Sequence, residues 1–439
     1  MSISRYSLSQ YRKTGVSGPF ILRLLPLATE TGFPMRLPFL SRFFAGIDPR
    51  GPEAFLLLSA AAQPVAFSTW QALLNNFAIE RASFSGADMG LLQSLREVPG
   101  LLALTVIFFL LVLREQTLLI VSLVLLGVGT AITGLFPSVL GLFITTIVMS
   151  IGFHYQETLQ QSLTLQWIDR ERAAPAMGRQ IAARGAAGLI AFAGVWLMLD
   201  VYGLDYAWVY AFGGALTVIL ALAAWMAYPR FPDAALQTKK LFLRKRYWLF
   251  YALTFMSGAR RQIFTVFAGF MMVEKFGYSA AQVTLLFIVN QAINMVFAGR
   301  IGAAIGRWGE RRALSLEYAG LIGVFVAYAV VENPYAAAGL YIIDNLLFSM
   351  AIAIRSYFQK IAAPADIAAS SGVSFTINHI AAVGIPGAFG LLWLTNPAAV
   401  FLTGAAMAAI SLTLARLVPE HPEPGHETLF ARRQKAVAH

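Results

Sequence analysis

The stretch YWLFYALTFMSGARRQIFTVFAGFMMVEKF, residues 247–276, carries Arg260 and Arg261 near the centre of an apolar run long enough to cross a lipid bilayer. A crossing helix needs roughly 20 such residues. A charged side chain at bilayer depth costs about 3 kcal/mol or more, so such residues face a bundle interior or a water-filled cavity. The stretch therefore predicts a polar cavity between membrane helices, an arrangement typical of a transporter.

The composition of the whole chain also indicates a membrane protein. Hydrophobic residues make up 58% of the 439 residues, charged residues only 13%, and the mean hydropathy is +0.66. A soluble domain of this size could not cover its surface with so few polar side chains. The absence of cysteine excludes disulfides and thiolate metal sites. We expect the lipid bilayer as a partner, and no cofactor, no metal ion and no nucleic acid, because the basic residues lie in short segments between apolar runs.

Apolar stretches of crossing length recur along almost the entire chain. About twelve are expected, which predicts an all-α membrane protein. They lie near residues 54–78, 89–113, 117–136, 139–163, 177–199, 207–228, 248–272, 280–305, 313–331, 335–357, 370–394 and 398–417.

The connecting segments divide sharply by charge. Lys and Arg gather in alternate connections, and the opposite set holds little beyond Arg81 and Lys275. Because positive residues accumulate on the cytoplasmic side, both termini and the central loop are predicted to be cytoplasmic. We expect a multi-pass protein of a bacterial inner membrane. The first 50 or so residues lack the pattern of a secretory signal; a disordered leader, an interfacial helix and a true start at Met35 remain open.

Five segments follow from these boundaries. A short repeat supports the division, because residues 84–87 (FSGA) and 278–281 (YSAA) occupy equivalent places in the two halves. Parallel six-helix repeats are a recurring transporter construction. The segments are a leader at 1–52, an N-terminal six-helix bundle at 53–228, a basic linker at 229–247, a C-terminal six-helix bundle at 248–418 and a tail at 419–439.

A motif between the eighth and ninth expected spans carries a family resemblance. The sequence GAAIGRWGERR, residues 302–312, is similar to the cytoplasmic-loop motif of the major facilitator superfamily. The chain departs from that motif at Gly306, where an Asp is usual, and at Glu310, where a basic residue is common. The resemblance implies that the third, sixth, ninth and twelfth spans lie outermost, where the only ionisable groups are Glu317 and Arg416 near the cytoplasmic ends. It also implies a gating role for Gly302, Arg307, Gly309, Arg311 and Arg312.

Ionisable residues inside the fourth span are candidates for coupling. His154 and Glu157 are three residues apart and share one helical face. A carboxylate and an imidazole at membrane depth are the parts of a proton relay. The alternative is structural, with His154 packed in the core and Glu157 paired with an arginine on a neighbouring helix.

Other mid-span polar residues complete the predicted site. Arg96 and Glu97 in the second span point about 100° apart on a helix and need not pair with each other; either one faces the cavity or both form structural bridges. For Arg260 and Arg261, we expect one side chain to face a cavity and bind an anion, and the other to pair with a residue such as Asp344. Asn290 and His379 add hydrogen-bonding groups at mid-depth.

The pattern as a whole favours secondary active transport. We expect a monomer that moves a small polar solute, anionic if an arginine binds it, by alternating access with proton coupling through Glu157 or Asp344. An efflux antiporter for amphipathic compounds is an alternative, and a transporter-like assembly factor or sensor is one of another class. An enzyme is not expected, because the chain has no phosphate-cradling glycine loop, no His-Glu-x-x-His and no cysteine nucleophile.

Overall fold

The computed structural model describes residues 46–102, 105–232, 243–363 and 366–430. The predictions for the leader before residue 46 and for the tail after residue 430 lie outside these ranges. The described residues are helical with short connections, and their only β pairing is an isolated bridge between Glu423 and His426. The all-α prediction is confirmed.

Three helices of the N-terminal half begin at a residue whose side chain caps them. Ser85 and Asp88 form a reciprocal capping box, and Ser138 and Asp205 cap the helices that follow them. Its helices are α3 (Pro52–Ala82), α4 (Gly86–Leu101), the short α5 (Val106–Leu110), α6 (Glu115–Thr133), α7 (Val139–Trp167), α8 (Arg170–Trp196, extended by a π-helical turn, Leu197–Val201) and α9 (Tyr206–Ala227).

The C-terminal half repeats this plan with two interrupted helices. Its first crossing consists of α10 (Trp248–Gln262), a π-helical turn (Ile263–Ala268) and α11 (Gly269–Glu274). A 3₁₀ turn, Ser349–Ala351, joins α14 to α15. The others are α12 (Ala280–Trp308), α13 (Glu310–Val330), α14 (Pro334–Phe348), α15 (Ile352–Ile361), α16 (Ile367–Thr395) and α17 (Pro397–Arg416).

Twelve crossings can be traced through the described residues, and nine of them are apolar enough to span a membrane by hydropathy and length alone. The other three are α3, α4 and the interrupted α10–α11 crossing. These three carry many of the buried polar side chains, including Asn76, Glu97 and Arg260. Such buried polar side chains mark helices that face other helices and not lipid.

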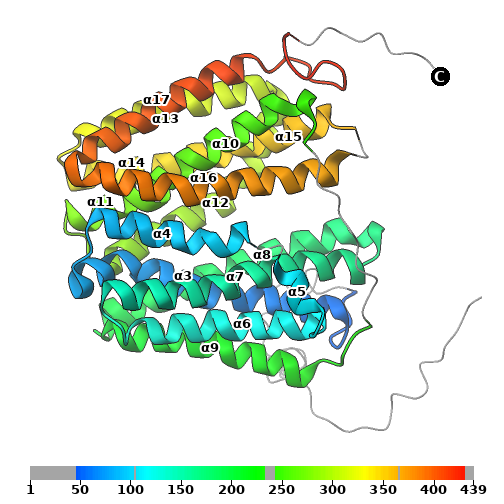
Figure 1. Cartoon of the computed structure of the whole chain (residues 1–439), viewed down its shortest axis with the longest axis vertical. Helices are drawn as coiled ribbons and strands as arrows, with labels where there is room; N and C mark the ends of the chain where they lie inside the picture. Colours follow the sequence, from blue (N-terminus) through cyan, green and yellow to red (C-terminus); the bar gives the residue numbers. More distant parts are fainter. Residues whose placement is uncertain (1–45, 103–104, 233–242, 364–365, 431–439) are drawn as a thin grey trace, which may run out of the picture.

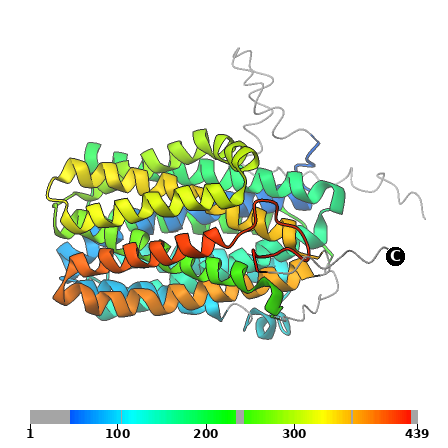
Figure 2. The same cartoon turned by 90° about the horizontal axis from the view of Figure 1, so that it is seen from above.

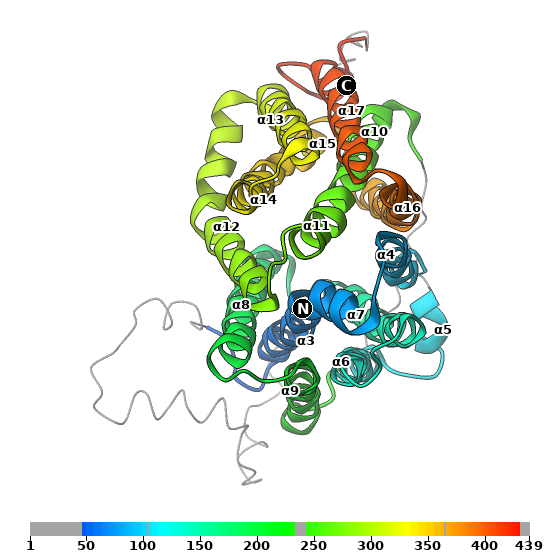
Figure 3. The ribbon, with the colours of Figure 1, turned by 90° about the vertical axis from the view of Figure 1, so that its left-hand side faces the viewer.

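The two halves lie side by side as separate bundles (Figure 1). Viewed along the helices, α4 lies beside α16 and α8 beside α12 where the bundles meet (Figure 3). The side view shows the chain's described ends on one side of the bundle (Figure 2). We call this the linker side, since α9 ends and α10 begins there, and we call the opposite side, where α3 gives way to α4, the far side.

The second crossing differs from the expected continuous span 89–113. Helix α4 ends at Leu101, and α5 is a separate short helix after residue 105. Pro99 and Gly100 account for the break, because proline removes a backbone donor and glycine weakens a helix. The consequence is that Arg96 and Glu97 lie in the last turns of a short helix.

Candidate functional site

The halves are in close backbone contact along α4 and α16. A Cβ placed on Gly90 would lie 2.2 Å from the carbonyl oxygen of Pro386, and one on Gly86 would lie 2.2 Å from the Trp393 ring. The backbone N–H of Gly387 donates to Ser94 Oγ over 2.9 Å. Glycine is required here because any side chain would hold the two helices apart.

Further contacts between the halves lie between the far side and mid-depth. Asn76 on α3 donates to the carbonyl of Tyr278 over 2.7 Å, and Gln291 on α12 donates to the carbonyl of Gly185 over 3.3 Å. Phe192 and Phe287 stack across the same boundary. The contacts described so far therefore close the boundary from the far side to the middle of the bundle.

A cluster of ionisable groups lies where the α4–α16 contact reaches mid-depth. Oε2 of Glu97 is 3.6 Å from Nε2 of His379 and 4.0 Å from Nε2 of His154. All three residues are at least nine-tenths buried. Arg96 binds the other carboxylate oxygen of Glu97 and also donates to Gln93 over 2.7 Å. The cluster unites α4 and α7 of one half with α16 of the other.

The structure shows how these residues pair. His154 faces Glu97 and His379, while Glu157 lies 3.4 Å from Arg184 on α8. Arg96 and Glu97, which need not have paired, form an ion pair with each other. The open alternative, in which Glu157 pairs with a neighbouring arginine, is the one observed.

Arg260 and Arg261 point in different directions from α10. The side chain of Arg260 has no exposed surface; its guanidinium is 4.2 Å from the centre of the Tyr318 ring and 3.9 Å from Glu317. Asp344 on α14 is also fully buried and is the next acidic group. Neither terminal nitrogen of Arg260 makes a hydrogen bond within the described chain, nor do the carboxylates of Glu317 and Asp344.

Arg261 is exposed although it lies in the middle of a crossing. Charged groups near it include Glu97, Arg96, Arg355 and Glu157. Three of these four belong to the other half, so Arg261 faces across the boundary. Arg261 is therefore an accessible cation that lies near charged groups of the opposite half.

Uncharged hydrogen-bonding groups join α12 to α14 and to the 3₁₀ turn that follows it. Asn345 donates to Asn294 over 3.1 Å, and Ser349 donates to the same oxygen over 3.1 Å. Asn290 is buried and its carbonyl oxygen has no partner among the described residues. An unpaired buried acceptor is costly unless a water or solute donates to it.

The expected gating loop joins α12 to α13. Gly309 has φ +79°, which glycine adopts without strain, and Gly302, Arg307 and Arg312 are exposed. Glu310 makes the firm contacts, since its buried carboxylate accepts from Lys360 and Ser356 on α15, each over 2.7 Å. Arg311, which is half-buried, is the second residue of α13.

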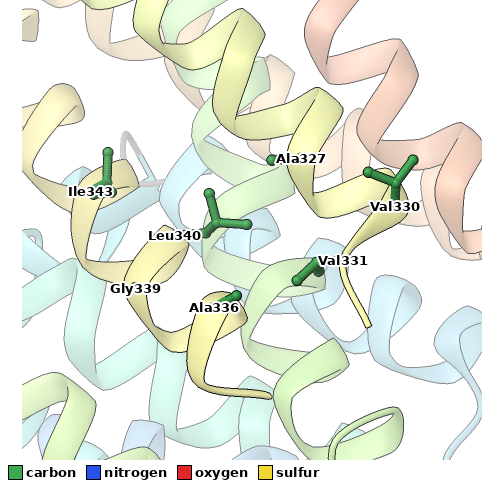
Figure 4. Close-up of a pocket in the computed structure, with 7 residues that line it drawn as sticks. All are labelled: Ala327, Val330, Val331, Ala336, Gly339, Leu340 and Ile343. Atoms are coloured by element: carbon green, nitrogen blue, oxygen red, sulfur yellow. The ribbon is translucent and has the colours of Figure 1, made fainter. Parts of the chain in front are cut away.

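Two hollows lie away from the boundary. An apolar one of about 390 Å³ separates the far ends of α13 and α14 and is lined by side chains such as Val330, Leu340 and Ile343 (Figure 4). It offers no group that would recognise a polar solute.

The second hollow, of about 440 Å³, lies on the linker side beside Arg244, Arg246 and Asp366. Burial acts to raise the pKa of Asp366, but hydrogen bonds from Arg246 and Tyr247 and the charge of Arg244 outweigh it and hold that pKa below its usual range.

Two candidate functional residues, Glu317 and Arg355, are evident only from the structure. Glu317 is fully buried beside Arg260. Arg355 is exposed and is one of the charged groups near Arg261. The sequence does contain a sign that Glu317 is buried. It is a carboxylate within an otherwise apolar outer helix, and exposing such a group to lipid is costly.

Comparisons with known proteins agree on the fold. Residues 54–386 match the description of the Major Facilitator Superfamily, and no curated protein sequence matches the chain. A crystal structure of the nucleoside transporter NupG is 16% identical, with a TM-score of 0.65, and the match covers 83% of this chain and 98% of that one.

Two further solved structures are similar over comparable lengths. A bacterial homologue of the human lysosomal transporter Spinster, in an inward-facing and occupied conformation, is 14% identical with a TM-score of 0.65, covering 84% of this chain and 97% of that one. A peptide transporter of the POT family is 13% identical with a TM-score of 0.65, covering 83% and 96%. Identities this low support the fold alone. Since the family match covers well over half of the chain, it belongs to the major facilitator superfamily, a family of membrane transporters.

Proposed function

We propose that the chain is a secondary active transporter for a small polar anion, which binds between the halves at Arg261 and moves by alternating access with proton coupling. The observation that carries this proposal is the placement of Arg261, which is exposed at mid-span and faces the opposite half. A guanidinium binds carboxylate or phosphate through two parallel hydrogen bonds.

The charge balance around Arg261 favours an anion. Arg96 is neutralised by Glu97, and Arg184 lies beside Glu157. Arg261 and Arg355 are left without a matching acidic group among these neighbours. An excess of positive charge in a water-accessible space attracts anions and repels lipophilic cations.

Alternating access requires that the contact between α4 and α16 open and close. The close backbone approach at Gly86 and Gly90 supports a closed far side in this conformation. The charged residues around Arg261 would then be reached from the linker side. This arrangement is consistent with the similarity to a Spinster homologue described as inward-facing.

The buried cluster of Arg260, Glu317 and Asp344 supports proton coupling. The three side chains have no exposed surface. If both carboxyl groups were ionised, the cluster of two carboxylates and one guanidinium would carry a net charge of minus one. Burial of an unbalanced charge is costly, so such a cluster tends to bind a proton. Glu157 fits this role less well, because its side chain is 44% exposed and already lies near Arg184.

Thermal stabilisation by solutes tests the binding part of this proposal. Purified protein is screened against organic anions, lipophilic cations and neutral solutes, because a bound ligand raises the midpoint of unfolding. We expect an anion to stabilise the wild type, Arg261→Gln to lose the response, and the control Arg230→Gln, which changes an exposed arginine of the linker, to keep it. Stabilisation only by lipophilic cations, unchanged in Arg261→Gln, would contradict the anion assignment and favour efflux.

A further inference from the structure

We propose that Glu97, His154 and His379 form a site for a divalent transition-metal ion of the Zn²⁺, Co²⁺ and Ni²⁺ class, and that the bound ion holds the two halves together in the present conformation. One oxygen or nitrogen of each residue lies within 4.8 Å of the others. Two imidazoles and one carboxylate, with a fourth position for water, are an established ligand set for zinc. This proposal does not depend on the identity of the solute.

The distances between the ligand atoms are close to those of a metal site. Bonds of about 2.0–2.1 Å in a tetrahedral site place ligand atoms roughly 3.3 Å apart. The carboxylate oxygen lies 3.6 Å from His379 Nε2 and 4.0 Å from His154 Nε2. Small rotations of the two rings and the carboxylate would bring all three atoms to coordination distance.

The ring nitrogens are available for coordination. Nδ1 of His379 lies 3.0 Å from the carbonyl oxygen of Phe375 and is placed to donate its proton there, which leaves the Nε2 lone pair facing Glu97. This hydrogen bond to the distal nitrogen is the usual support of a metal-binding histidine. Neither nitrogen of His154 makes a hydrogen bond within the described chain, although the residue is only 5% exposed.

Gly100 makes room for both imidazole rings. A Cβ at this position would lie 2.4 Å from Nε2 of His379 and 2.6 Å from Cε1 of His154. The two rings converge directly on this glycine, with centroids 5.4 Å apart. The convergence therefore depends on a backbone position without a side chain.

The surrounding charges decide which ions would bind. Arg96 occupies one oxygen of Glu97 and leaves the other facing the histidines, and Arg261 is the next positive group. This positive surrounding disfavours ions held by charge alone, such as Ca²⁺ and Mg²⁺, which also prefer all-oxygen sites. Imidazole ligands instead suit Zn²⁺, Ni²⁺ and Cu²⁺.

The position of the ligands implies a mechanical effect. Glu97 and His154 belong to the N-terminal half, whereas His379 belongs to α16 of the other half. An ion bound to all three would oppose separation of α4 from α16, the movement that alternating access needs. Binding would therefore stabilise this conformation relative to the other one.

Cobalt absorption tests the site without any transport assay. The chain has no cysteine and five histidines, so visible bands of bound Co²⁺ can be assigned with few competitors. On protein purified without a polyhistidine tag, we expect a one-to-one Co²⁺ spectrum that Zn²⁺ displaces. His379→Gln and Glu97→Gln should each weaken binding at least tenfold, whereas the control His421→Ala should not.

Mono-dispersity on size exclusion shows that each variant is folded, and His154→Gln gives a second ligand change if another variant is unstable. Absence of a Co²⁺ spectrum in the wild type, or equal affinity in wild type and folded ligand variants, would overturn the site.

Distance measurements test the mechanical effect. The native absence of cysteine allows spin labels at Asp169→Cys and Gln359→Cys, two exposed positions on the linker side of opposite halves. Zn²⁺ is expected to narrow the distance distribution to one population, and His379→Gln should abolish this response. Zinc that binds without changing the distribution would overturn the claim that the ion joins the halves.

Discussion

The guanidinium of Arg260 lies 3.9 Å from the carboxylate of Glu317, and neither side chain has any exposed surface. Its neighbour Arg261 is exposed and faces the opposite half of the molecule. Two consecutive arginines in one helix therefore have different physical roles, one inside the C-terminal bundle and one at the boundary between the bundles.

Removal of Arg260 should destabilise the protein strongly. Arg260→Ala leaves Glu317 and Asp344 buried without a compensating charge, and breaking such a pair costs about 3–5 kcal/mol. Arg261→Ala should cost less than about 1 kcal/mol, because its side chain is accessible to water. Denaturation of both variants in detergent compares them directly, and equal losses of stability would refute the assignment of different roles.

Enlarging Gly90 should shift the conformational equilibrium. A Cβ at this position would meet the Pro386 carbonyl at 2.2 Å, so Gly90→Ala pushes α4 away from α16. Gly384→Ala on α16 is the control, since nothing lies within 4 Å of its added carbon. Spin labels on the two halves should report a smaller population of the present conformation for Gly90→Ala alone, and an unchanged distribution would argue against a moving α4–α16 contact.

Asp366 should contribute stability that depends on pH. Its pKa is lowered in the folded protein by Arg246, Tyr247 and Arg244. A lowered pKa means that the folded state favours the ionised form, so the contribution is present above the unfolded value of about 3.9 and is lost as the pH falls through the folded pKa.

Thermal unfolding of wild type and Asp366→Asn between pH 3 and pH 7 checks this expectation. The wild type should unfold at a higher temperature near neutral pH, and the difference should shrink below about pH 4. A difference that grows on acidification would have the wrong sign for an ion-paired aspartate.

Glu310 should matter more than the arginines beside it. Its carboxylate is 1% exposed and accepts from Lys360 and Ser356, whereas Arg312 is exposed. Glu310→Ala leaves the Ser356 hydroxyl without this acceptor and should cost about 1–3 kcal/mol, while Arg312→Ala should change stability by less than about 0.5 kcal/mol. Chemical unfolding gives the free energy of unfolding of each variant. A larger loss for Arg312→Ala than for Glu310→Ala would contradict this prediction.

The fold was predictable because length and hydropathy mark most crossings. The crossings that contain α3, α4 and α10 were also predicted, although they carry polar residues. The apolar runs around Arg96 and Arg260 are long enough to cross a bilayer and contain few charged residues. The end of α4 at Leu101 was not predicted, although Pro99 and Gly100 were visible, because local sequence does not show how far a weakened helix continues.

For the candidate site, the sequence predicts which residues take part but not that they lie together. Arg96, Glu97, His154 and His379 were all selected, but their convergence depends on the packing of α4, α7 and α16. Glu97 and His379 are 282 positions apart in the chain, and no local spacing relates them. The burial of Glu317 against Arg260 likewise follows from helix packing within the C-terminal half.

Uptake into proteoliposomes tests the central proposal most directly. Protein is reconstituted with an imposed pH gradient, and uptake of the radiolabelled anion that stabilises it is compared among wild type, Arg261→Gln and Arg230→Gln. We predict gradient-driven uptake in the wild type and in Arg230→Gln, and at least a tenfold loss in Arg261→Gln. Uptake that is equal in all three proteins, or absent from a folded wild type, would contradict transport of an anion through Arg261.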